Sequence, residues 1–202
     1  MYAHYKTEIG KSKNNHSKLK VNMLHNKKNL SVYLYGAAII FAGIFLLYSK
    51  YYTFQTIKSI TGTTLIVGAL LSFISTITSQ RKQVAFFYHE MHTWTMLIYG
   101  VCVLLVCNKI ETLINFTSFL LVFYAFSEII FCSWLFNLGK KINYKILYVR
   151  LFLGLLAGIG VIFTMYNPAI NKNFILEGFG LLFIIIGINI LLYIPIMKTI
   201  EI

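Results

Sequence analysis

Long apolar runs separated by short polar segments occupy the chain from residue 31 onward. The runs lack the polar/apolar alternation of a barrel strand, and several reach the length of about 20 residues with which a helix crosses a bilayer. A segment in hydrocarbon must satisfy its own backbone hydrogen bonds, which favours helices. The pattern therefore predicts an all-α, polytopic membrane protein. The six predicted transmembrane helices cover residues 31–48, 59–79, 93–108, 112–137, 147–167 and 174–197.

Glycines recur in these runs with a spacing that indicates an internal repeat. The offset that places Gly154 on Gly36 also places Gly180 on Gly62, and Gly100 marks a third copy between them. We therefore expect three consecutive helical hairpins, formed by the first and second, third and fourth, and fifth and sixth helices. Small residues let helix backbones approach closely. The predicted helix-packing positions are Gly36, Gly62, Gly68, Gly100, Gly154, Gly180 and Gly187.

Residues 1–30 differ from the rest because they carry seven lysines against one acid, Glu8, and have no apolar period. They predict a basic, disordered cytoplasmic tail attached to a helical bundle over residues 31–198. The formal net charge is +12, but lysines beside a membrane are explained by anionic lipid headgroups, so we expect no nucleic-acid partner. The predicted partners are the bilayer itself and anionic lipids at the tail.

The distribution of Lys and Arg sets the expected orientation, because cytoplasmic loops are enriched in both. Apart from the tail, one side of the predicted bundle carries Arg81, Lys82, Lys140, Lys141, Lys145 and Lys198. The other side carries Lys50, Lys58, Lys109 and Lys172. Six spans with the more basic side inward place both termini in the cytoplasm.

Two charges inside predicted helices are the strongest candidates for a functional site. Glu128 lies deep in the run 112–137, and Arg150 lies in the early turns of the next helix, at a comparable distance from the basic loop between them. In an antiparallel hairpin the two would share one depth, and an unpaired charge in hydrocarbon is costly, so we expect an ion pair. Two interpretations stay open. The pair is a structural pin, which is the preferred interpretation, or it is a proton or substrate site inside the bundle.

Other polar residues have simpler interpretations. Glu177 stands near the start of the sixth helix, where it either caps the helix dipole or lines an extracytoplasmic vestibule. His89 and His92 are three apart rather than four as in the HExxH motif, so residues 84–92 are expected to lie along the interface, with weak metal binding or pH sensing as the alternative. The chain has no Asp and no catalytic, cofactor or metal motif. The sequence therefore predicts neither an enzyme nor a cofactor.

A combination of motifs accompanies the repeat. It consists of Tyr35-Gly36, Tyr99-Gly100, Leu153-Gly154, the turn Asn167-Pro168, and the glycine-rich run from Gly178 to Gly187. This combination resembles the HdeD family of small bacterial inner-membrane proteins. The resemblance implies a six-helix bundle in the bacterial cytoplasmic membrane with a role in envelope or acid stress. The chain departs from the family pattern in its middle repeat and at Tyr51-Tyr52-Thr53, where a proline is expected.

Three functional hypotheses follow. The preferred one is a non-enzymatic, HdeD-like membrane protein that acts through packing or through a partner. The second is a small transporter or proton-conducting channel that uses Glu128, with Arg150 as its counter-charge. The third is a membrane anchor or assembly subunit that uses the basic N-terminal tail. The small-residue helix faces also permit a homo-oligomer or a membrane partner.

Overall fold

The computed structural model describes residues 30–78, 84–137, 142–166 and 171–200. Within these ranges every regular element is a helix. The first helix covers Leu30–Leu47 and is followed by a short 3-10 turn, η1 (Ser49–Tyr51). The remaining helices are α2 (Phe54–Thr78), α3 (Val84–Val106), α4 (Ile110–Phe136), α5 (Tyr144–Tyr166), α6 (Lys172–Leu191) and α7 (Tyr193–Ile200).

Five of the described helices are long and apolar enough to cross a membrane. They are the Leu30–Leu47 helix, α2, α4, α5, and α6 together with the start of α7. The expected all-α, multi-pass architecture is confirmed by this set. The predicted third span, α3, is not among the five, because its first half carries the polar residues His89, Glu90 and His92.

α3 also differs from the expectation in where it begins. Residues 84–92 were predicted as a separate segment along the interface, with a helix starting near Thr93. Instead α3 is one continuous helix from Val84 to Val106. The segment contains neither Gly nor Pro to interrupt a helix. Three of its polar side chains, those of Tyr88, His89 and His92, also contact residues inside the bundle, as described below.

The end of the predicted sixth helix is interrupted as well. α6 ends at Leu191, Leu192 is its C-cap, and α7 begins at Tyr193. Pro195 explains the break, because it has no N–H to donate to the carbonyl of Leu191. A proline is tolerated in the first turn of a new helix, where the N–H groups have no intrahelical partner.

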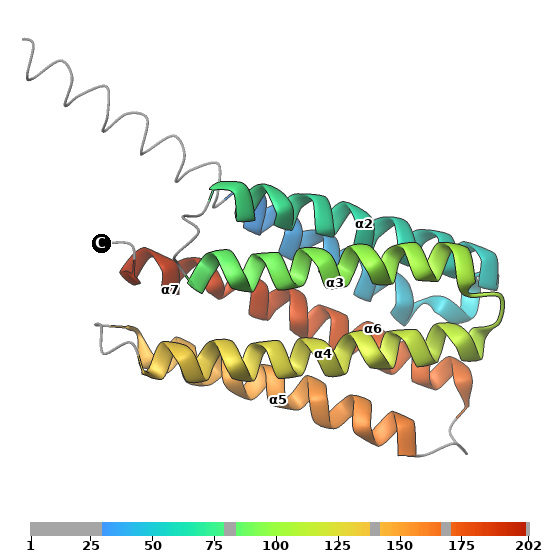
Figure 1. Ribbon diagram of the computed structural model, residues 1–202. Helices are drawn as coiled ribbons and strands as arrows, with labels where there is room; N and C mark the ends of the chain where they lie inside the picture. Colours follow the sequence, from blue (N-terminus) through green and yellow to red (C-terminus); the bar gives the residue numbers. More distant parts are fainter. Residues whose placement is uncertain (1–29, 79–83, 138–141, 167–170, 201–202) are drawn as a thin grey trace, which may run out of the picture.

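The helices pack as closely associated pairs (Figure 1). Among the labelled helices, α2 with α3 and α4 with α5 make the most extensive contacts. The Leu30–Leu47 helix packs on α6, because a Cβ built at Gly36 would lie 3.2 Å from the carbonyl oxygen of Gly187. The expected hairpin partners α3/α4 and α5/α6 also touch, but less extensively. The closest pairs therefore cross the boundaries of the predicted hairpins.

The N-terminal end of the first helix and α7 lie at the same end of the bundle in Figure 1. The C-terminal end of α2, the N-terminal end of α3 and the ends of α4 and α5 that face each other lie there as well. The predicted tail precedes this end and falls outside the described residues, apart from Leu30, which belongs to the first helix. The two ends of the described chain therefore emerge on one side.

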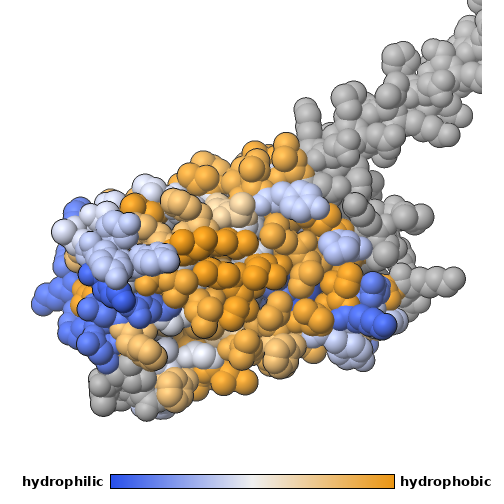
Figure 2. All heavy atoms as spheres, turned by 180° about the vertical axis from the view of Figure 1, so that it is seen from behind, coloured by the Kyte–Doolittle hydropathy of each residue, from blue (hydrophilic) through white to orange (hydrophobic). Residues whose placement is uncertain are grey.

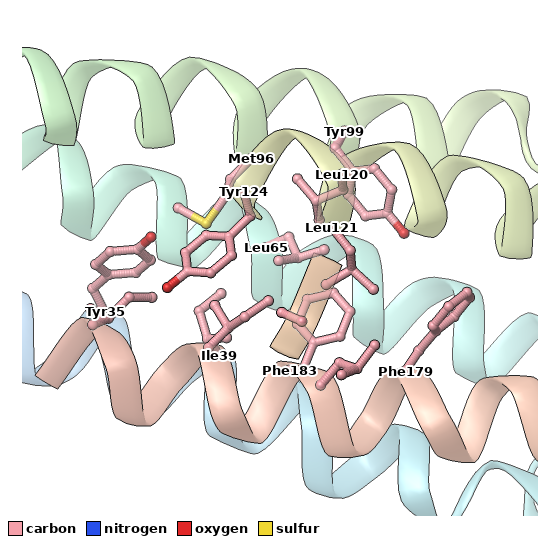
Figure 3. Packing of buried hydrophobic residues seen from close by; sticks show 14 of the residues in the cluster. Tyr35, Ile39, Leu65, Met96, Tyr99, Leu120, Leu121, Tyr124, Phe179 and Phe183 are labelled. Carbon is pink, nitrogen blue, oxygen red and sulfur yellow. The ribbon is translucent and has the colours of Figure 1, made fainter. Parts of the chain in front are cut away.

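The surface and the interior are both apolar, as expected of a protein in lipid. Figure 2 shows a broad hydrophobic band between two more hydrophilic ends. Large side chains such as Leu105 and Phe119 are exposed in this surface, where acyl chains would cover them. The interior is one cluster of buried residues that includes Ile39, Leu121 and Phe183 (Figure 3). Because lipid is as apolar as this core, helix association depends on close packing and polar contacts.

Candidate functional site

The structure brings Glu128 and Arg150 together inside the bundle. Nη2 of Arg150 lies 2.7 Å from Oε1 of Glu128, and Nε donates to the same oxygen at 2.8 Å. Both side chains are completely buried. α4 ends at Phe136 and α5 begins at Tyr144. At 1.5 Å per residue, both charges therefore lie about 9–12 Å from the same end of the bundle.

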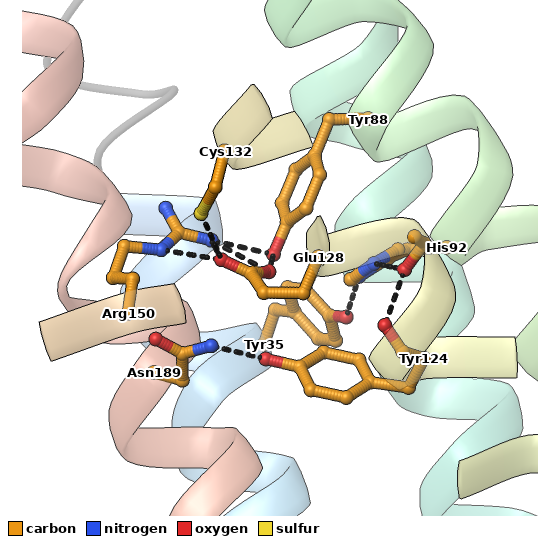
Figure 4. A network of polar contacts seen from close by, with 9 residues as sticks. Tyr35, Tyr88, His92, Tyr124, Glu128, Cys132, Arg150 and Asn189 are labelled. Atoms are coloured by element: carbon orange, nitrogen blue, oxygen red, sulfur yellow. Dashed lines mark hydrogen bonds and ion pairs between the residues drawn. The ribbon is translucent and has the colours of Figure 1, made fainter. Parts of the chain in front are cut away.

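Tyr88 of α3 completes this contact (Figure 4). Its hydroxyl accepts a hydrogen bond from Nη2 of Arg150 at 2.8 Å and donates to Oε2 of Glu128 at 2.9 Å. Nη2 of Arg150 also donates to Oε2 at 3.0 Å. The thiol of Cys132 lies 3.7 Å from Oε1. Three helices are thereby joined by a buried charge pair whose carboxylate oxygens both accept hydrogen bonds.

Aromatic rings enclose the guanidinium of Arg150. Its Cζ lies 4.9 Å from the ring centroid of Phe131, 5.3 Å from that of Tyr88 and 5.4 Å from that of Tyr193. Cations are attracted to aromatic faces at such distances, more strongly when water is excluded. Nη1 has no hydrogen-bond partner among the described residues. The three aromatic rings therefore stabilise the part of the guanidinium that makes no hydrogen bond.

A second polar chain lies beside the first. The hydroxyl of Tyr35 lies 2.8 Å from Nδ1 of His92, and Nε2 of His92 lies 3.1 Å from the hydroxyl of Ser127. The rings of His92 and Tyr88 have their centroids 4.2 Å apart, which connects the two chains through a ring contact. Tyr35 comes from the first helix and Ser127 from α4, so His92 joins three helices.

α6 contributes one further polar contact. The side-chain nitrogen of Asn189 donates to the hydroxyl of Tyr124 at 2.7 Å. Both residues are buried. With this contact, hydrogen bonds from four long helices and the first helix converge on one region of the interior (Figure 4).

A small cavity adjoins the second chain. Its volume is about 30 Å³, and it is lined mainly by aliphatic and aromatic side chains, with Tyr35, His92 and Tyr124 among them. A cavity of this size holds about one water molecule. Such a water would touch the histidine side of the network, while the cavity lining does not include Glu128 or Arg150.

The packing glycines show why Glu128 fits at its position. Where the first helix meets α6, Gly36 faces Gly187, and where α3 meets α2, Gly100 faces Gly62. Where α5 meets α4, the repeat glycine Gly154 faces the side chain of Glu128 instead.

These contacts change the expected register of the repeat. The sequence offset made Gly62 equivalent to Gly180. In the structure Gly62 faces Gly100 just as Gly187 faces Gly36, so the residue equivalent to Gly62 is Gly187. Gly180 faces Gly43 of the first helix, whose carbonyl oxygen would lie 2.7 Å from a Cβ at Gly180. Gly68 is different, because the nearest atoms to its Cβ position are 3.7 Å away, in ordinary contact. Gly68 was predicted to permit close helix packing, and the structure does not require a glycine there.

Glu177 does not cap α6. The helix begins at Lys172, and its N-cap is Asn171, whose side chain accepts a hydrogen bond from the backbone N–H of Asn173 at 2.9 Å. Glu177 lies beyond the first turn, and its carboxylate lies 3.9 Å from Nζ of Lys50. With both side chains partly exposed, this is an ion pair between η1 and α6 at the surface. The vestibule interpretation of Glu177 stays a prediction.

His89 and His92 are both buried, which corrects their predicted place among lipid headgroups. Their environments differ. His92 belongs to the polar chain, while the ring of His89 packs edge-on against Tyr193 at a centroid distance of 4.7 Å. Among the described residues no three His, Cys, Asp or Glu side chains gather in a way that could hold a metal ion.

Tyr88, His92 and Tyr35 are members of the network that the sequence did not identify as such. A usable signal was present. Tyr88 and His92 are four residues apart and continue the helical spacing of the buried residues Met96 and Tyr99. They were missed because residues 84–92 were assigned to the interface, and because two of the partners, Tyr35 and Arg150, lie on helices that are not adjacent to α3 in the sequence.

Comparisons of the chain with protein-family models, with curated proteins and with solved structures find no match.

Proposed function

We propose that this chain is a non-enzymatic, HdeD-like membrane protein that supports the bacterial envelope under stress, and that Glu128 and Arg150 form an internal tie. The observation that carries the proposal is the complete burial of both charges in contact with each other and with Tyr88. A transport site needs access for its substrate, whereas the adjoining cavity has room for about one water molecule. The motif resemblance supports the stress role.

The proposal includes six membrane crossings, which are the five candidate spans and, in addition, α3. Two observations support it: α3 packs along α2, which is itself a candidate span, and its polar residues His89 and His92 are buried in the bundle. A polar half that faces protein is compatible with a transmembrane position. The proposed location is the bacterial cytoplasmic membrane, with the tail and both termini in the cytoplasm and anionic lipid at the tail.

Cysteine labelling tests the number of crossings. In a cysteine-free background, Thr53→Cys, Asn108→Cys and Asn143→Cys each place one thiol at an exposed position between helices. With six crossings, a membrane-impermeant maleimide added outside intact cells reacts at positions 53 and 108 and fails at 143. If α3 does not cross, positions 53 and 108 label from opposite sides.

The internal tie is tested by unfolding the purified protein. Glu128→Gln should lower stability because Arg150 loses its counter-charge, and it should leave proton permeability unchanged. The matching measurement is proton flux into proteoliposomes that carry an inward pH gradient and an internal pH-sensitive dye, with empty liposomes as the control. Flux above that control would contradict the proposal.

Proton conduction is the second candidate function, and one observation favours it. Polar and titratable side chains lie in contact from Arg150 through Glu128 and Tyr88 to the rings of His92 and Tyr35, beside the cavity. In this alternative Glu128 releases and rebinds a proton. Wild-type flux that disappears in Glu128→Gln would establish it over the internal tie.

The anchor hypothesis concerns residues outside the described ranges. A chain that lacks residues 1–28 should keep an intact bundle. If this variant loses the proposed role in envelope stress while its free energy of unfolding is unchanged, the basic tail is the part that holds a partner or anionic lipid.

A further inference from the structure

The first helix and α2 are each packed against a different neighbour, and this leaves a groove between them. Gly36 and Gly43 bring the first helix against α6, and Gly62 brings α2 against α3. Between the two, side chains of both helices line an open groove of about 430 Å³. Its walls are Leu34, Ala37, Ala38 and Phe41 on one side and Thr63, Thr64, Val67 and Leu71 on the other.

The groove is closed at its floor. The hydroxyls of Ser31 and Ser75 lie 2.6 Å apart and join the two helices toward one end. Near the middle, Cδ1 of Ile39 lies 3.7 Å from the Cβ position of Gly68. The groove is therefore a depression in the surface and does not pass through the protein.

The lining is mostly apolar and combines large side chains at the rim with two alanines. Ala37 and Ala38 leave space where larger residues would fill it. The threonines are the polar members, and the hydroxyl of Thr63 donates to the carbonyl of Ser59 in its own helix at 2.7 Å. That hydroxyl is therefore already satisfied without a polar ligand.

We propose that this groove binds one acyl chain of a membrane phospholipid. Both walls are candidate membrane spans, so the groove is continuous with the apolar surface that the protein presents to the bilayer. Exposed side chains at its rim, such as Phe41 and Val67, belong to that surface. A lipid chain is a narrow, flexible and apolar ligand of the kind that such a lining accommodates.

A second copy of the protein fits this groove less well. A helix with its side chains is about 10–12 Å across, whereas the walls here belong to two helices that touch at the floor. An acyl chain is narrower than a helix, so we expect it to fit between the walls without separating the two helices. The groove therefore points to lipid rather than to a helix of another protomer.

Filling the groove tests the proposal. The protein is reconstituted into vesicles of phosphatidylethanolamine and phosphatidylglycerol, extracted in mild detergent, and weighed by native mass spectrometry. The double variant Ala38→Leu/Thr64→Leu fills the groove from both walls. The control is Ser133→Leu, which adds similar bulk at an exposed position of α4. The double variant should lose one phospholipid mass that wild type and Ser133→Leu retain.

Equal phospholipid retention in all three proteins would overturn the proposal. A dimer mass in wild type that the double variant loses would also overturn it, because the occupant would then be a second copy. Thermal unfolding establishes that each variant is folded. If the double variant does not fold, the single variant Ala37→Leu carries the test, because Ala37 is exposed at the groove and its enlargement leaves the interior unchanged.

Discussion

Gly154 of α5 lies directly against the side chain of Glu128 on α4. A Cβ at Gly154 would stand 2.9 Å from Cγ of Glu128 and 3.1 Å from its Cβ. At the other two close pairs, the corresponding glycine faces the backbone of a second glycine. In those pairs the missing side chain lets two helix backbones approach closely. At Gly154 it leaves room for the side chain of Glu128 beside Arg150.

Gly154→Ala should therefore destabilise the protein by displacing this carboxylate. The clash involves Cγ and Cβ rather than the end of the side chain, and the carboxylate is held by Arg150 and Tyr88, so the side chain cannot move freely. Overpacking of this kind costs about 1–3 kcal/mol. Unfolding of the purified protein in mixed micelles with increasing SDS measures the loss.

Gly68→Ala is the control for this substitution. The nearest atoms would lie 3.7 Å from the new methyl group, which is ordinary contact. Alanine also favours the helix over glycine by about 1 kcal/mol. This variant should be as stable as wild type or more so. An equal loss in both variants would show that any alanine in these helices is damaging and that the Glu128 contact is not special.

Removing one member of the ion pair should cost more than removing both. Glu128→Leu leaves Arg150 as an uncompensated buried charge, and Arg150→Met leaves Glu128 in the same state. Each single change should destabilise by about 3–5 kcal/mol, and the double variant by less than either single change, because it leaves no uncompensated buried charge. A double-mutant cycle of unfolding free energies gives the coupling. Additive losses would contradict a direct tie between these two residues.

Tyr88→Phe isolates the hydroxyl that lies between the two charges. The ring keeps its contacts with Phe131 and Tyr193, while Nη2 of Arg150 and Oε2 of Glu128 each lose one hydrogen bond. The expected loss of stability is about 1–3 kcal/mol. Tyr148→Phe, at an exposed position on α5, should have no measurable effect. If both variants unfold alike, the hydroxyl does not support the ion pair.

The meeting of Glu128 with Arg150 could be anticipated from the sequence because both lie in adjacent helices at similar distances from one loop. This is a local argument, and it needs only antiparallel geometry. Tyr88 and His92 could not be placed in the same way. Their hydrogen-bond partners, which include Tyr35 and Ser127, are far away in the sequence. Polar residues at the start of a helix are therefore ambiguous between the interface and the interior until the tertiary contacts are known.

The glycines show a similar limit. Their spacing indicates which helix faces permit close approach, but it does not name the helix that approaches. Gly36 and Gly62 were expected within one hairpin. Instead Gly36 packs against Gly187 of α6, and Gly62 packs against Gly100 of α3. Loop lengths differ among the repeats, so a constant sequence offset does not preserve the register of contacts.

Two glycines of α6 provide the sharpest test of the helix pairing. A Cβ at Gly180 would stand 2.6 Å from the backbone nitrogen of Leu47 and 2.7 Å from the carbonyl oxygen of Gly43. Backbone atoms cannot rotate away, so Gly180→Ala must separate the first helix from α6. The expected loss is about 1–3 kcal/mol or more.

Gly178→Ala is the matched control, because it lies in the same helix and nothing stands within 4 Å of its Cβ position. It carries the same gain in helix propensity as Gly180→Ala, so the difference between the two variants reports the contact alone. Unfolding in SDS mixed micelles should show a loss for Gly180→Ala and none for Gly178→Ala. Equal stability of the two variants would mean that α6 does not pack on the first helix through Gly180, and the pairing that shapes the lipid groove would then have to be revised.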